Sequence, residues 1–70
     1  MWRLRNIRDH RRAYSLIVPN GSKAAAAWFS QGILQESRSF STWHYALRWL
    51  EDKLETLQMY GWRLDDRDLR

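Results

Sequence analysis

The hydrophobic pattern is most regular between residues 42 and 60, where apolar side chains recur at helical spacing. One side of such a helix would carry Trp43, Ala46, Leu47, Leu50, Leu54, Leu57 and Gly61. A repeat near 3.6 residues is typical of an amphipathic helix that packs on a core. Ser41 is expected to cap its N-terminus, and Gly61 to provide the left-handed residue after its C-terminus. The pattern therefore predicts one helix over about 42–60.

Shorter segments on both sides of this helix have the composition or alternation of strands. Residues 13–18 (AYSLIV) are rich in strand formers and end at the turn sequence Pro-Asn-Gly. Residues 33–40 and 62–64 are expected to be further strands. Near the N-terminus, Trp-Arg-Leu-Arg at residues 2–5 alternates so that Trp2 and Leu4 would face a core.

Residues 22–30 support two interpretations. Four consecutive alanines after Ser22 favour a short helix. The Asn20-Gly21 step directly after a strand favours a returning strand in a hairpin. We favour the hairpin because a lone strand would leave its edges unpaired, and the helix remains the alternative.

These elements predict an α+β fold: a small antiparallel sheet of three to five strands packed against one amphipathic helix, with a short C-terminal strand. The chain has 70 residues, so we expect a single small domain over 1–70. Besides several tryptophans, the expected core contains Leu4, Leu16, Val18, Leu47, Leu50, Leu54 and Leu57.

Composition narrows the class of protein. The chain has no cysteine, which excludes disulfides and thiolate zinc sites. Its longest apolar run, residues 24–29, is six residues and too short to span a membrane. The basic N-terminus is not followed by the apolar stretch of a secretory signal. We therefore expect a cytoplasmic protein without a membrane partner.

No pattern of catalytic residues is present. The chain has no GxSxG, P-loop, GxGxxG or HExxH motif. His10 and His44 lie in different predicted segments, and the carboxylates fall mainly on the outer side of the helix or in the C-terminal tail. Acid–base catalysis needs groups whose surroundings separate their pKa values. We expect a non-enzymatic protein with no catalytic residue, no cofactor and no metal site.

The net charge of +4 is concentrated at the N-terminus. Residues 1–12 hold one aspartate and five arginines, namely Arg3, Arg5, Arg8, Arg11 and Arg12. A basic segment on a neutral body is typical of nucleic-acid contact through phosphates. The alternative is internal pairing with carboxylates, since adjacent terminal strands would bring Arg3 and Arg5 near Asp65 or Asp66.

A second candidate surface lies beside the apolar side of the helix. Tyr45, Trp49 and Tyr60 form a neighbouring row there, with Lys53 near Trp49. Exposed aromatic residues dominate many protein interfaces, so this row predicts a homodimer or docking on a larger protein. The alternative is that Trp49 and Tyr60 are covered by the N-terminal segment or the tail.

The order of strands, capped helix and closing Gly-aromatic strand over residues 33–65 resembles small phage-encoded regulators that bind host machinery. The resemblance is one of element order, and it implies docking on a larger partner. Our leading hypothesis is a binding protein that docks on a larger protein or nucleoprotein, as an inhibitor or regulator. The arginines would steer association, and the aromatic row would provide apolar contact. The alternative is direct DNA or RNA binding by the same arginines and the outer face of the sheet.

Overall fold

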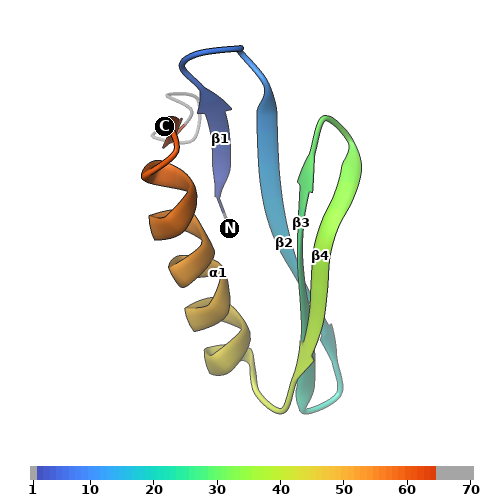
Figure 1. Ribbon diagram of the computed structural model, residues 1–70. Helices are drawn as coiled ribbons and strands as arrows, with labels where there is room; N and C mark the ends of the chain where they lie inside the picture. Colours follow the sequence, from blue (N-terminus) through green and yellow to red (C-terminus); the bar gives the residue numbers. More distant parts are fainter. Residues whose placement is uncertain (1, 65–70) are drawn as a thin grey trace.

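The computed structural model describes residues 2–64, which form one helix packed on one face of a five-stranded antiparallel sheet (Figure 1). The strand order is β4-β3-β2-β1-β5. The elements are β1 (Arg3–Asn6), β2 (Arg12–Asn20), β3 (Lys23–Ser30), β4 (Ile33–Phe40), α1 (Trp43–Gln58) and β5 (Trp62–Leu64). The predicted α+β fold is therefore confirmed. None of the helical residues in 2–64 forms a segment long and apolar enough to cross a membrane.

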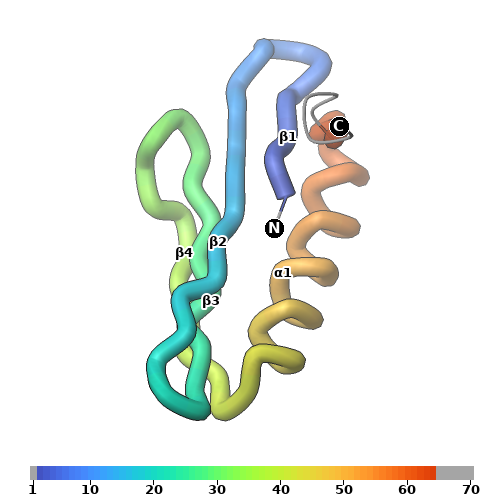
Figure 2. Tube along the Cα trace, turned by 180° about the vertical axis from the view of Figure 1, so that it is seen from behind, coloured from blue at the N-terminus to red at the C-terminus, as the bar shows by residue number. Residues whose placement is uncertain are grey.

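The two terminal strands are neighbours in the sheet. β5 pairs antiparallel with β1, and Leu4 lies opposite Leu64; Figure 2 shows this end of the sheet from behind. Trp2 and Leu4 are buried whereas Arg3 and Arg5 are exposed, so the alternation predicted for this segment is confirmed. The aspartates at 65 and 66, which we expected near these arginines, lie outside the described residues.

Residues 23–30 form a strand, so the hairpin interpretation is correct. Asn20 pairs with Lys23, and Gly21 in the turn between them has a positive φ of 63°. Ala24 and Ala26 are buried on the side that α1 covers. Their small side chains let the helix approach the sheet, and this gives the alanine run a role in a strand rather than in a helix.

The predicted core positions in β2 are wrong. Ala13 and Ile17 are the buried apolar residues of this strand, whereas Val18 is 52% exposed and Leu16 faces the same side as Val18. Because Leu16, Ile17 and Val18 are all apolar, hydrophobicity alone does not choose which side turns inward. Pairing with β3 decides it, since Ile17 lies opposite the buried Ala26 beneath the helix.

The helix begins at Trp43, one residue later than predicted, and its N-cap is shifted by one residue as well. Thr42, not Ser41, has the extended N-cap conformation, with φ −142°, and its hydroxyl accepts a hydrogen bond from the backbone N–H of Tyr45 at 3.3 Å. The prediction for Ser41 is therefore wrong, although both residue types can cap a helix. At the other end, Gly61 adopts the expected left-handed conformation, with φ 91°.

The core is held together partly by tryptophans. The indole N–H of Trp2 donates to the carbonyl of Leu50 at 2.9 Å, which joins the N-terminal segment to α1. Trp2 also exchanges hydrogen bonds with Ser15 of β2, and its ring lies 6.3 Å from that of Trp28. Leu4 and Leu50 are fully buried beside this cluster. The helix is thus fixed on one face of the sheet only.

Candidate functional site

The sheet has one face covered by α1 and one face on which no element of residues 2–64 lies (Figures 1 and 2). We call the second one the open face. Residues directly opposite each other in antiparallel strands project to the same side, so the strand register assigns its members. They are Arg3, Arg5, Arg12, Tyr14, Leu16, Val18, Asn20, Lys23, Ala25, Ala27, Phe29, Leu34, Ser37, Ser39 and Arg63.

Three arginines lie in register across neighbouring strands of the open face. Arg5 of β1 is opposite Arg12 of β2 on one side and Arg63 of β5 on the other. Adjacent strands are about 4.8 Å apart, so the three positions span roughly 10 Å. Among the described residues this face carries no aspartate or glutamate. The arrangement therefore concentrates positive charge at one edge of the sheet.

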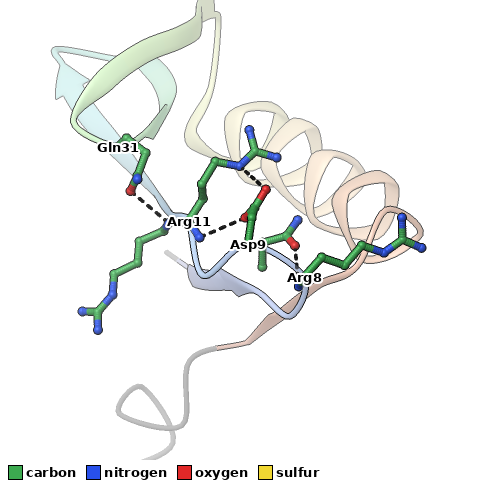
Figure 3. Close-up of polar contacts among 6 residues, drawn as sticks. Arg8, Asp9, Arg11 and Gln31 are labelled. Atoms are coloured by element: carbon green, nitrogen blue, oxygen red, sulfur yellow. Dashed lines mark hydrogen bonds and ion pairs between the residues drawn. The ribbon is translucent and has the colours of Figure 1, made fainter.

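Hydrogen bonds fix the side chain of Arg63 at one end of the row and the backbone of Arg12 at the other. The guanidinium of Arg63 donates to the carbonyls of Gln58 at 3.0 Å and Trp62 at 2.9 Å, at the negative end of the α1 dipole. The backbone of Arg12 is bonded to Gln31, whose amide oxygen accepts from the Arg12 N–H at 3.2 Å and whose own N–H donates to the Arg12 carbonyl at 2.9 Å (Figure 3). The side chains of Arg5 and Arg12 form no ion pair with any described residue.

Beside the arginine row, the open face carries a group of apolar and aromatic residues, and Asn20, Lys23, Ser37 and Ser39 lie farther along the strands. Tyr14 and Phe29 lie opposite each other, with ring centroids 4.9 Å apart and ring planes at 14°. Leu34 continues this row on β4, and Leu16 and Val18 follow along β2. Tyr14 remains 40% exposed. An exposed apolar area next to a charged one marks a surface suited to binding.

The remaining arginines of the N-terminal segment lie at the β1–β2 turn. Arg11 folds back onto Asp9, with 2.7 Å between Nε and Oδ2 (Figure 3), and its guanidinium lies 5.4 Å from the centre of the Trp62 ring. The pKa of Asp9 is lowered, mainly by the hydrogen bond from the backbone N–H of Arg11. Arg8 lies beside Gly61 and forms no ion pair within residues 2–64. Arg11 thus forms an ion pair within the protein, as the alternative hypothesis for the N-terminal arginines predicts.

The aromatic row predicted on the helix does not form one continuous surface. Trp49 is half-buried: its ring packs 5.8 Å from that of Phe40, at the end of β4, and Lys53 lies 5.4 Å above it. Tyr45 and Tyr60 are exposed, but Tyr45 lies in the first turn of α1 and Tyr60 lies just beyond its last residue, Gln58. The helix rises about 20 Å between Tyr45 and Gln58. β4 and Lys53 cover Trp49, whereas the two tyrosines lie at opposite ends of α1.

An ion pair joins the helix to the sheet on the covered side. Glu36 of β4 accepts hydrogen bonds from Lys53 of α1 at 2.8 Å and from the Trp28 indole at 3.1 Å. The Lys53 ammonium, and then the indole, hold the pKa of Glu36 below its ordinary value. Within residues 2–64 no group of three or more histidine, aspartate or glutamate side chains is placed to hold a metal ion. The contact of Glu36 with Lys53 and Trp28 joins β4 to α1 and β3.

The open face combines predicted and unpredicted residues. It brings together Arg3, Arg5 and Arg12 from the predicted set and adds Tyr14, Phe29 and Arg63, which the sequence analysis missed. Placing Ile17 inward would have turned Tyr14 outward by simple alternation. The adjacency of Arg63 to Arg5 has no local signal, since it depends on pairing of the terminal strands.

Comparison with known proteins finds no relative of this chain. No protein-family model, no curated protein and no solved structure matches the chain.

Proposed function

We propose that the protein is a non-enzymatic nucleic-acid-binding domain that contacts the phosphate backbone with its open face. The observation that carries this proposal is the row of Arg63, Arg5 and Arg12 in register on a face without a described acidic residue. Arginine suits phosphate because its planar guanidinium donates two parallel hydrogen bonds to one anion. Like charges placed directly opposite destabilise a sheet. A polyanion would relieve that repulsion.

The distribution of charge over the described residues supports one orientation of the protein on a nucleic acid, with the open face toward the phosphates. The exposed side of α1 carries Glu51, Asp52 and Glu55, on the opposite side of the molecule from the arginine row. Arg48 and Lys53 offset most of this negative charge, so a nucleic acid would be attracted to the open face and not to the helix. This polarity favours direct nucleic-acid binding over the docking hypothesis.

Docking on a larger protein, as an inhibitor or regulator, stays a prediction. The three aromatic residues proposed to contact that protein do not form one surface. Trp49 packs against Phe40, while Tyr45 and Tyr60 lie at opposite ends of the helix. A homodimer through the open face is disfavoured, since a self-complementary interface would bring two arginine rows into one contact. An acidic protein surface is the partner that could replace nucleic acid there.

Fluorescence anisotropy with labelled mixed-sequence DNA and RNA, over a series of salt concentrations, tests the proposal. We expect the logarithm of affinity to fall linearly with the logarithm of salt concentration, by about 0.7 to 0.9 per phosphate contacted. Arg5→Gln combined with Arg12→Gln should weaken binding to all sequences and reduce this slope by about 2.

The matched control combines Arg38→Gln with Arg48→Gln, which removes the same charge away from the open face. Arg48 lies on the exposed side of α1, and Arg38 lies opposite the buried Ala26, on the covered side of β4. We expect its salt slope to equal that of the unaltered protein. Absence of binding at low salt, or equal losses in both double variants, would refute the proposal.

A further inference from the structure

The open face has two halves that lie side by side. Its basic half holds Arg3, Arg5, Arg12 and Arg63, and the half beside it holds the apolar residues Leu16, Val18, Tyr14, Phe29 and Leu34. This apolar half is bordered by Ser37 and Ser39 on β4 and ends at Asn20 and Lys23, where β2 and β3 meet their turn. The halves meet within β2, where Arg12 and Tyr14 are two residues apart and therefore about 7 Å apart on the same side. A ligand lying across this boundary needs negative charge on one side and exposed flat apolar surface on the other.

We infer that the open face selects unpaired, single-stranded nucleic acid, with phosphates on the basic half and bases on the apolar half. This inference rests on the proposed function. An unpaired strand presents both its phosphates and the faces of its bases. In a duplex the base faces are stacked inside, so the apolar half would lie against charged backbone and water.

The shape of the sheet also opposes duplex recognition. The five strands of the sheet span four inter-strand spacings, or about 19 Å. The major groove of DNA is about 12 Å wide and admits a helix or a two-stranded ribbon. The open face cannot enter it, and contact with a duplex would be limited to phosphates at the surface.

The aromatic pair is ordered before any ligand binds. Tyr14 and Phe29 stack on each other from directly opposite positions of β2 and β3, with ring planes at 14°. A base that packs on them need not immobilise a free side chain, which removes one cost of association. Base–aromatic contacts tolerate any sequence because every base has a π-face. We therefore expect selection for strandedness rather than for sequence.

The experiment compares the affinity of the full chain for a labelled 20-nucleotide strand and for its duplex at one salt concentration. We expect the single strand to bind at least tenfold more tightly. Phe29→Leu and Tyr14→Leu keep apolar bulk but remove a ring, and each should weaken single-strand binding by about tenfold while leaving duplex binding and the salt slope unchanged. Tyr14→Phe should retain the affinity of the unaltered protein.

Tyr45→Leu is the matched control, because Tyr45 is an exposed aromatic residue on α1 rather than on the open face. Its affinities should be unchanged. Salt-dependent binding of equal strength to strand and duplex would overturn the inference and leave the proposed function standing. Failure of the protein to bind either ligand would overturn both.

Discussion

At the scale of single residues, Trp2 makes the contact that joins the start of the chain to the helix. Its ring is buried, its indole N–H bonds the carbonyl of Leu50, and its backbone is paired with Ser15. In a small domain with little surface to bury, one such contact is a large part of the net stability. Trp2 also fixes the beginning of β1, the strand that carries Arg3 and Arg5.

Trp2→Phe should destabilise the fold by about 1–3 kcal/mol, because it removes a buried hydrogen-bond donor as well as ring volume. The change in urea midpoint, followed by circular dichroism, measures this. Trp43→Phe is the control, since Trp43 is 44% exposed and its indole N–H has no partner among the described residues. Equal destabilisation by the two substitutions would show that the hydrogen bond to Leu50 contributes nothing.

At the scale of elements, the contact of Glu36 with Lys53 and Trp28 connects the outer hairpin to the helix. β4 is an edge strand and most of its side chains are exposed, so it has few apolar contacts with α1. The ion pair and the packing of Phe40 on Trp49 are therefore the means by which α1 holds this edge. This hairpin also carries Phe29 and Leu34 of the open face.

Hydrogen bonds to the charged form of Glu36 lower its pKa in the folded protein. The charged Glu36 therefore stabilises the fold fully above its unfolded pKa, and this stabilisation is lost as the pH falls through its folded pKa. The unaltered protein should exceed Glu36→Gln in stability at pH 6, by a few tenths of a kcal/mol for so exposed a pair. The difference should begin to close below about pH 4.5. Urea denaturation of both proteins between pH 6 and 3 checks this, and a difference independent of pH would contradict it.

At the scale of the whole molecule, charge and apolar surface are divided between two sides. In the described part of the chain the open face carries arginines and no acidic residue, whereas the exposed side of α1 carries Glu51, Asp52 and Glu55 together with Arg48. The net charge of +4 does not show this uneven distribution, in which the excess of positive charge lies on the open face. We therefore expect the same arginines to strengthen nucleic-acid binding and to lower the stability of the fold.

Arg5→Gln should raise stability at low salt by about 0.2–1 kcal/mol while weakening nucleic-acid binding. Arg5 lies directly between Arg12 and Arg63, so its removal relieves repulsion on both sides. The gain should shrink as salt screens the charges. Thermal unfolding at low and high salt measures it, and a loss of stability at low salt would show that the row does not strain the sheet.

Local sequence was sufficient wherever one period or one residue type decided the outcome. The apolar repeat of α1, the alternation Trp-Arg-Leu-Arg and the left-handed Gly61 were all predicted, because each follows from geometry within a few residues. The antiparallel α+β fold followed from the order of these elements. Ser41 and Thr42 are both good N-cap residues, so local rules predicted the start of the helix but not which of the two caps it.

Only the tertiary structure decided which residues make up the open face. The side to which Leu16, Ile17 and Val18 turn was set by the pairing of β2 with β3 beneath the helix. The arginine row needed β5 to pair with β1, which joins Arg63 to Arg5 from opposite ends of the chain. The sequence by itself determined most of the elements, because their formation depends on near neighbours. Residues 23–30, which had local signals for both helix and strand, form a strand paired with β2 and β4. The candidate binding surface was decided in three dimensions, because strand register is a long-range property that no local pattern contains.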